Sequence, residues 1–161
     1  MIDSKKAVKD AIKGRAIFYL HMYRTLEQEF GPERSRELMR KAIYRWGQEK
    51  ASNCPAEASI DPRIMAEEFI KGGQSTLMIF GNEIVEAEHA GAILRLNACP
   101  LVEAWKEAGL EPPEIALMCD MAYAVDFGKY EGLGYTLEFP CRISTGGDYC
   151  QLNLNPLQSH L

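Results

Sequence analysis

Thiols are the most reactive side chains that this sequence offers. The chain has five: Cys54, Cys99, Cys119, Cys141 and Cys150. An odd number of cysteines, with no secretory signal evident, predicts reduced thiols rather than a disulfide framework. Cys99 directly precedes Pro100, at the predicted start of a helix, where unpaired amides and the helix dipole favour the thiolate. We therefore expect Cys99 to have a lowered pKa and to be catalytic, and Glu103, one turn along, to bind substrate.

A second group of chemical residues lies in one apolar helical segment. Cys119, Tyr123 and Asp126 are spaced i, i+4 and i+7, so they share one helix face. Asp120 follows Cys119, and a carboxylate is costly to bury unless it is paired or serves a site. We expect Cys119, Asp120 and Asp126 to be catalytic and Tyr123 to bind substrate. The alternative places both carboxylates in solvent and Cys119 in the core.

Cys141 and Cys150 flank the turn of a predicted β-hairpin, because apolar and polar residues alternate on both sides of it. If residues 144–147 form a four-residue loop, Cys141 stands directly opposite Cys150 on the apolar face. A slip of two residues would pair Cys141 with Leu152 instead. Pro140 has no amide hydrogen to donate, so we expect it at an unpaired edge or in a bulge.

Further residues complete the expected site. Cys150 and Asp148, near the start of the last strand, are expected to bind substrate. His89, between two predicted strands, is expected to act as an acid or base, although a turn histidine is commonly a surface residue. We expect no metal and no other cofactor, because the Cys and His residues form no local ligand pairs. Folding could assemble a metal site only from distant residues such as His89, Cys99, Cys119 and Cys150.

The elements that position these residues are predicted to be helices, then a hairpin, two more helices and a last hairpin. Apolar spacing predicts helices over 4–30, 32–50 and 62–72, strands over 77–88 and 92–98, helices over 100–108 and 112–127, and a hairpin over 133–154. This order predicts an α+β fold with N-terminal helices packed on an antiparallel sheet of about four strands. With no repeat or linker, residues 1–161 are expected to form a single domain.

Composition limits the classes of partner. Hydrophobic residues make up 47% of the chain, enough to bury a core, and the net charge of -5 disfavours nucleic acid and anionic membranes. The apolar runs, such as 77–80, are far shorter than the roughly 18 residues of a membrane span. We therefore expect a cytoplasmic protein whose partner is a small-molecule substrate.

Short motifs in a fixed order also give the sequence a family resemblance. They are Arg15-Ala16 with Tyr19, a turn at Gly31, Cys99-Pro100 followed by Glu103-Ala104-Trp105-Lys106-Glu107, Cys119-Asp120, and Gly147-Asp148-Tyr149-Cys150. With them the chain resembles the L-2-amino-thiazoline-4-carboxylic acid hydrolase family over about residues 15–154. The resemblance implies hydrolytic opening of a cyclic amidine, at a carbon–nitrogen bond that is not a peptide bond, to a carbamoyl-cysteine. The element order also resembles vinyl-reductase-like and haem-nitric-oxide-binding-like ligand-binding domains.

Two functions are consistent with these patterns. The first is a small-molecule hydrolase that opens a cyclic amidine or amide. In it Cys99 or Cys119 attacks the substrate directly, or Asp120 activates water with Asp126 or His89 as its partner. We favour the cysteine route. The second is a domain that binds or senses a small ligand without catalysis.

The reactive thiols lead to a geometric and a chemical expectation. Cys99, Cys119 and Cys150 should line one pocket between the late helices and the sheet. Near pH 7, alkylation should label Cys99 faster than Cys119 or Cys141, because only Cys99 begins a helix. Cys54, in a predicted loop, serves as the reference for simple exposure.

The sheet edges generate a prediction about assembly. A sheet of about four strands has two edges, and Pro140 blunts one of them, so we predict a homodimer through the other. Size-exclusion chromatography with light scattering should give about twice the 18.1 kDa of one chain. The mass of a single chain would contradict the prediction.

Overall fold

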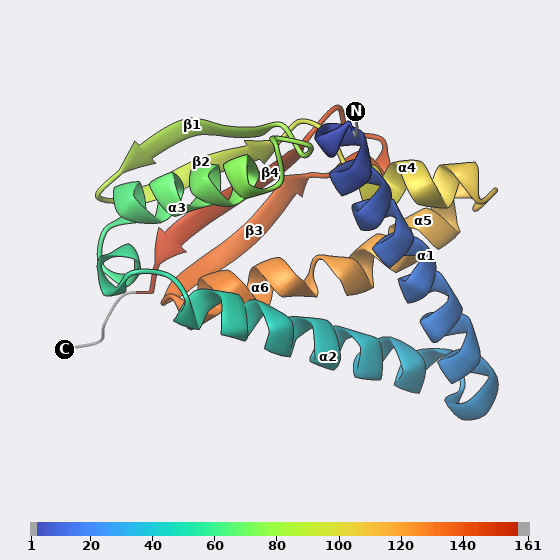
Figure 1. Ribbon diagram of the computed structural model, residues 1–161. Coiled ribbons are helices and arrows are strands. Elements are labelled where there is room, and N and C mark those ends of the chain that lie inside the picture. The colour runs from blue at the N-terminus through green and yellow to red at the C-terminus, as the bar shows by residue number, and fades with distance from the viewer. Residues whose placement is uncertain (1–2, 158–161) are drawn as a thin grey trace.

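Four antiparallel strands form one sheet in a computed structural model that describes residues 3–157. The strands are β1 (Asn82–Glu88), β2 (Gly91–Leu96), β3 (Tyr135–Cys141) and β4 (Cys150–Pro156), in the spatial order β1-β2-β4-β3 (Figure 1). The helices are α1 (Ser4–Phe30), α2 (Pro32–Ser52), α3 (Pro62–Ser75), α4 (Pro100–Glu107), α5 (Pro112–Ala122) and α6 (Ala124–Gly132), with short 3-10 helices η1 (Ala56–Ser59) and η2 (Ile143–Thr145). The predicted α+β class, with N-terminal helices and a four-stranded antiparallel sheet, is confirmed.

Local sequence signals set the helix boundaries. Gly31, at φ 78°, separates α1 from α2, and Pro32 then occupies the first position of α2. The Asp61 carboxylate caps α3 by accepting a hydrogen bond from the Arg63 amide at 2.9 Å. Capping residues and prolines thus fix where the chain enters these helices.

The predicted strand over 77–88 is shorter than expected, because β1 begins only at Asn82. Its first residues instead form a turn in which Leu77 and Met78 have φ values of 52° and 54°. The Met78 amide donates a hydrogen bond to the Gly73 carbonyl at 2.8 Å, which closes the carboxyl end of α3. The apolar residues 77–80 therefore belong to the turn that ends α3 and do not form a strand.

The predicted helix over 112–127 is divided in two. α5 ends at Ala122, and Tyr123, with ψ near -3°, connects it to α6. The Asp126 amide donates a hydrogen bond to the Tyr123 carbonyl at 2.9 Å, so a tight turn follows immediately. The i, i+7 spacing of a straight helix therefore does not describe how Cys119 and Asp126 are related.

The register predicted for the last hairpin is wrong. Cys141 pairs with Gln151 rather than with Cys150 or Leu152, because β3 contains an irregularity between Glu138 and Cys141 that adds one residue. The turn is also longer than four residues, since η2 and a bend separate the strands. Pro140 lies within the irregularity, on an edge strand, as its missing amide hydrogen requires.

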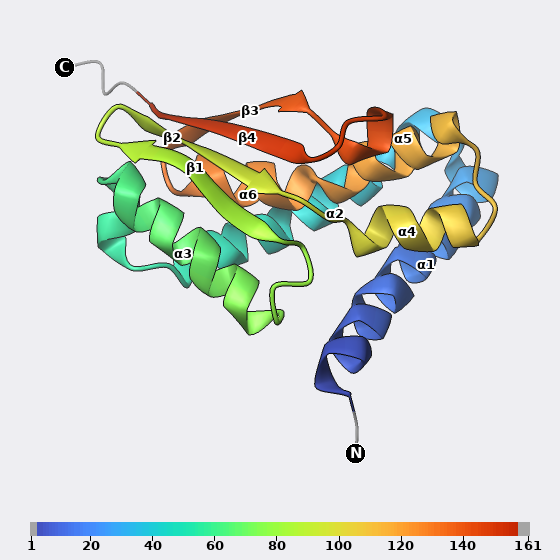
Figure 2. The same cartoon turned by 90° about the horizontal axis from the view of Figure 1, so that it is seen from above.

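The apolar residues form two core clusters. One lies between the sheet and the helices that cover it: α3 packs on β1 and β2, and α6 packs on β3 (Figures 1 and 2). The other joins α1, α2, α4 and α5 around Trp105, whose indole N–H donates to the Ala16 carbonyl at 2.9 Å. Within residues 3–157, no helix is long and apolar enough to cross a membrane.

α2 and α6 lie side by side at unusually close range, and glycines make this possible (Figure 1). A Cβ atom at Gly128 would lie 2.0 Å from the Tyr44 carbonyl oxygen, and one at Gly47 would lie 2.1 Å from the Val125 carbonyl oxygen. Both contacts are with backbone atoms, so no side chain can move to relieve them. The crossing therefore depends on glycine at both positions.

The crossing can be tested with one substitution and a matched control. Gly128→Ala should lower the free energy of unfolding by roughly 2 kcal/mol or more, because overpacking outweighs the higher helix propensity of alanine. Gly14→Ala, in α1, should instead leave stability unchanged or raise it by up to about 1 kcal/mol, since its Cβ would meet nothing within 4 Å. Urea denaturation followed by circular dichroism measures both. A Gly128→Ala protein as stable as the wild type would contradict the close crossing.

Candidate active site

A cavity of about 260 Å³ lies where the two core clusters meet. Leu101 and Trp105 of the first cluster line it, together with Phe69 and Tyr130 of the second. Such apolar walls with a few polar groups are typical of small-molecule sites. The cavity is therefore the place where the chemical residues are of most interest.

Three thiols line this cavity, and burial keeps them protonated. Cys99, Cys119 and Cys150 all belong to its lining. Burial raises the pKa of Cys99 to about 12, although the amides of Leu101 and Val102, in the first turn of α4, act in the opposite direction. The expected lowering of the Cys99 pKa is therefore wrong. The helix terminus does favour the thiolate, but the loss of water around the sulfur outweighs it.

The two other thiols of the cavity, Cys119 and Cys150, are also unsuited to be thiolates. Burial raises the pKa of Cys150 to about 11 and also raises that of Cys119. Cys141 lies outside the cavity lining, and its thiol donates to the Tyr149 carbonyl at 3.2 Å. The cavity thus presents a wall of neutral thiols near pH 7.

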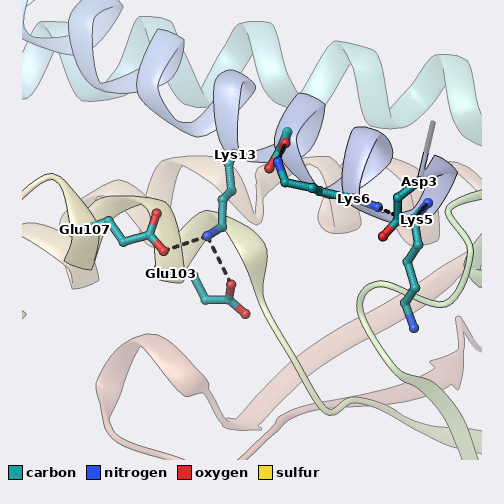
Figure 3. Close-up of polar contacts among 7 residues, drawn as sticks. Asp3, Lys5, Lys6, Lys13, Glu103 and Glu107 are labelled. Atoms are coloured by element: carbon teal, nitrogen blue, oxygen red, sulfur yellow. Dashed lines mark hydrogen bonds and ion pairs between the residues drawn. The ribbon is translucent and has the colours of Figure 1, made fainter. Parts of the chain in front are cut away.

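Glu103 forms ion pairs with two lysines of α1. Its carboxylate pairs with Lys9 at 2.7 Å and with Lys13 at 3.4 Å. Lys13 also reaches Glu107 at 2.7 Å, and Figure 3 shows both contacts of Lys13. These contacts join α4 to α1 on the surface. Glu103 lies outside the cavity lining, so the structure does not bring it to the other predicted site residues.

His89 and Asp148 are also separated from the cavity. His89 is exposed in the turn between β1 and β2, and Asp148 is exposed in the bend before β4. Neither residue belongs to the cavity lining. Both are polar residues of surface turns, and a sequence pattern cannot distinguish such residues from those of a site.

Asp120 is held in a network of hydrogen bonds and ion pairs. Its carboxylate lies 2.6 Å from Arg36 and 3.2 Å from Arg40, and it accepts a hydrogen bond from the Tyr123 hydroxyl at 2.7 Å. Burial alone would raise the pKa of Asp120, but the hydrogen bonds from Tyr123 and Arg36 and the two guanidinium charges together lower it. Asp120 therefore ties α5 to α2, while Tyr123 turns its ring to the cavity lining.

Asp126 is the carboxylate of the cavity lining. Among residues 3–157 its side chain forms no hydrogen bond and has no cation within 4.0 Å. Burial raises its pKa to about 6, although the charges of Lys129, Lys50 and Arg15 act against this rise. A carboxylate with a pKa near the working pH can both accept and release a proton.

Four cations line the same cavity: Arg15, Lys50, Lys129 and Arg142. Aromatic rings support them. Arg15 and Lys50 lie over Trp46, with their cationic groups 5.1 Å and 4.5 Å from the ring centroid. Within the described chain, none of the four has a carboxylate within 4.0 Å, and the buried Arg15 Nε atom has no hydrogen-bond partner. One carboxylate against four cations makes the cavity suited to an anion.

Sequence reasoning missed most of these cations. Arg15 entered only as part of a motif, and Lys50, Lys129 and Arg142 resembled ordinary surface charges. One signal was available, because Trp46 and Lys50 are four residues apart and face the same side of α2. Arg142 gave no signal, since an irregular turn positions it.

The thiols and carboxylates do not form a metal centre. Across residues 3–157, no three His, Cys, Asp or Glu side chains approach one another closely enough to hold a metal ion. Folding does not bring His89 to the three cavity thiols, because His89 lies in the turn between β1 and β2, outside the cavity lining.

Fold and cavity together describe an α+β domain with a cavity lined by three thiols, four cations and one carboxylate. The chain belongs to the L-2-amino-thiazoline-4-carboxylic acid hydrolase family, whose model matches residues 10–154. The resemblance seen in the motifs is confirmed. No curated protein sequence matches the chain. Family membership suggests a hydrolase that acts on carbon–nitrogen bonds.

The two half-buried carboxylates, Asp126 and Asp120, should have opposite effects on stability. Asp126 has a raised pKa of about 6, so its favourable contribution is present below about pH 4 and is lost as the pH rises through 6. Asp126→Asn should therefore stabilise the protein at pH 7.5, by up to about 3 kcal/mol, and the gain should vanish near pH 4.

Asp120 provides the matched comparison because its pKa is lowered. Asp120→Asn should destabilise the protein at pH 7.5, and the loss should shrink as the pH falls. Urea denaturation at several pH values measures both variants. Equal signs for the two substitutions at pH 7.5 would contradict this assignment.

Proposed function

We propose that the protein hydrolyses a cyclic amidine that carries a carboxylate, of the 2-amino-thiazoline-4-carboxylate type. The single observation that carries the proposal is Asp126, a carboxylate without a partner in a cavity lined by cations. Membership of the family supports the choice of a carbon–nitrogen bond. The cavity, of about 260 Å³, has room for a five-membered ring with small substituents.

Ring opening requires a nucleophile and a proton for the leaving nitrogen. In the proposed step Asp126 accepts a proton from water while the water oxygen bonds to the amidine carbon. Asp126 returns this proton to the ring nitrogen. As the ring carbon–nitrogen bond breaks, the added hydroxyl becomes the carbonyl and its proton passes through Asp126 to the same nitrogen, which leaves as an amine. The carbamoyl group remains on sulfur, so the product is an S-carbamoyl-cysteine and one water is consumed.

The neighbouring cations support both parts of this role. Arg15, Lys50 and Lys129 keep the pKa of Asp126 from rising further, so the carboxylate is ionised near pH 7 and able to accept a proton. Their excess positive charge also attracts an anionic substrate. Burial and the charges of Lys129 and Arg15 lower the pKa of Lys50, as expected where positive charges accumulate without counterions.

Water is the preferred nucleophile because the other candidates are unsuited. A thiol attacks as its thiolate, and burial raises the pKa of Cys99, Cys119 and Cys150. Asp120 is neutralised by Arg36 and Arg40 and lies outside the cavity lining. In this proposal the thiols form one wall around the substrate, and Asp120 holds the elements together.

Activity of the Asp126 variant is the main test. Asp126→Asn should lower kcat by about 100-fold or more, because general base catalysis contributes roughly 10²–10⁴-fold. Asp10→Asn, an exposed α1 residue paired with Lys6, is the matched control and should keep wild-type kcat. Formation of the carbamoyl-cysteine from 2-amino-thiazoline-4-carboxylate, measured by mass spectrometry, gives the rate.

The pH profile supplies an independent check. Wild-type kcat/KM should fall below about pH 6, where Asp126 becomes protonated, with a slope that corresponds to one proton. Ligand binding without any turnover by the wild type would favour the ligand-binding alternative instead.

The thiols can be tested separately from the carboxylate. Cys99→Ser should retain kcat within about threefold, because water rather than the thiol attacks, and the native protein should alkylate at Cys99 more slowly than at Cys54 near pH 7. A loss of kcat as large as that of Asp126→Asn would restore the cysteine route.

A further inference from the structure

We propose that Arg142 is the residue that recognises the carboxylate of the substrate, and this assignment rests on the proposed function. Arg142 follows β3 and lines the cavity. Like Arg15, Lys50 and Lys129, it has no carboxylate within 4.0 Å among residues 3–157, but unlike them it is not one of the charges that act on Asp126.

Aromatic rings fix the position of Arg142. Its guanidinium carbon lies 4.8 Å from the centroid of the Tyr123 ring and 6.0 Å from that of Phe139. These two rings contact each other at 5.3 Å between centroids, and Phe127 completes the cluster. A guanidinium stacked on aromatic faces keeps its edge N–H groups free for a bidentate carboxylate.

A second guanidinium shares the Tyr123 ring but is already paired. Arg40 lies 5.5 Å from the ring centroid and forms an ion pair with Asp120 at 3.2 Å. Asp120 also accepts the Tyr123 hydroxyl hydrogen bond, which fixes the ring that supports Arg142. Within residues 3–157, Arg142 itself has no carboxylate within 4.0 Å and donates no side-chain hydrogen bond.

The charges of the cavity separate into two groups. Lys129, Lys50 and Arg15 lower the pKa of Asp126, so these three cations face the proposed base. Arg142 lines the same cavity as Cys119, and its charge lowers the pKa of that thiol. A substrate could thus place its amidine carbon near Asp126 and its carboxylate on Arg142.

Pairing a residue change with a ligand change tests this assignment. The ligands are 2-amino-thiazoline-4-carboxylate and its carboxamide, which lacks the charge. Arg142→Gln should raise KM for the carboxylate by about 10- to 100-fold, with kcat changed by less than threefold, because a charge-assisted bond is lost. KM for the carboxamide should be the same in both proteins. Arg142→Lys should recover part of the loss.

Binding without turnover makes the test independent of catalysis. The aromatic probes 2-aminothiazole-4-carboxylate and its carboxamide cannot be ring-opened by this route, and Trp46 and Trp105 line the cavity as fluorescent reporters. Wild type should bind the carboxylate probe about 10- to 100-fold more tightly than Arg142→Gln does, and the carboxamide probe equally. The matched rival is Arg15→Gln, which should reduce the preference for the carboxylate probe over the carboxamide probe by less than Arg142→Gln does.

Each result decides the assignment. A charge-specific loss in Arg15→Gln and none in Arg142→Gln would overturn it, as would an equal loss of both probes in Arg142→Gln. Wild type that binds neither probe would overturn both this assignment and the proposed function. A charge-specific loss in Arg142→Gln in a protein that hydrolyses neither substrate would support the assignment and overturn only the proposed function.

Discussion

The contact between α2 and α6 is the constraint on which the site depends. Because Gly47 and Gly128 have no side chains, the two helices approach until backbone meets backbone. At that separation Lys50 on α2 and Asp126 on α6 line one cavity. A wider crossing would move Asp126 away from Lys50, one of the three cations that limit the rise of its pKa to about 6. Backbone packing therefore influences the pKa of Asp126, whose side chain takes no part in the helix contact.

The position of the cations in the cavity depends on aromatic residues. Cations that line a cavity with a single carboxylate could instead be paired with acids, and pairing would cancel the charge that attracts an anion. Here Trp46 and Tyr123 support the cationic groups through their ring faces instead. Because the rings carry no net charge, the cavity remains positive and its cations remain available to a ligand.

Most of the fold could be predicted from the sequence, but only part of the site could be. The helices could be located from the spacing of apolar residues and from the helix boundaries at Gly31-Pro32 and Asp61-Pro62, since these signals act over a few residues. The register of the last hairpin failed because one extra residue near Pro140 shifts every pair beyond it. Cys99 shows the same limit in chemistry: its helix position was readable, but the depth of burial that dominates its pKa is a tertiary property.

The contrast between the cavity and the whole molecule has a consequence for how a ligand arrives. The chain carries a net charge of -5, whereas the cavity lining has an excess of cations. An approaching anion therefore meets repulsion at long range and attraction only at short range. Salt screens the long-range part first, because the screening length is about 8 Å at physiological ionic strength. Moderate salt should thus speed the diffusional encounter, the reverse of what it does to an enzyme whose whole surface steers its substrate inward.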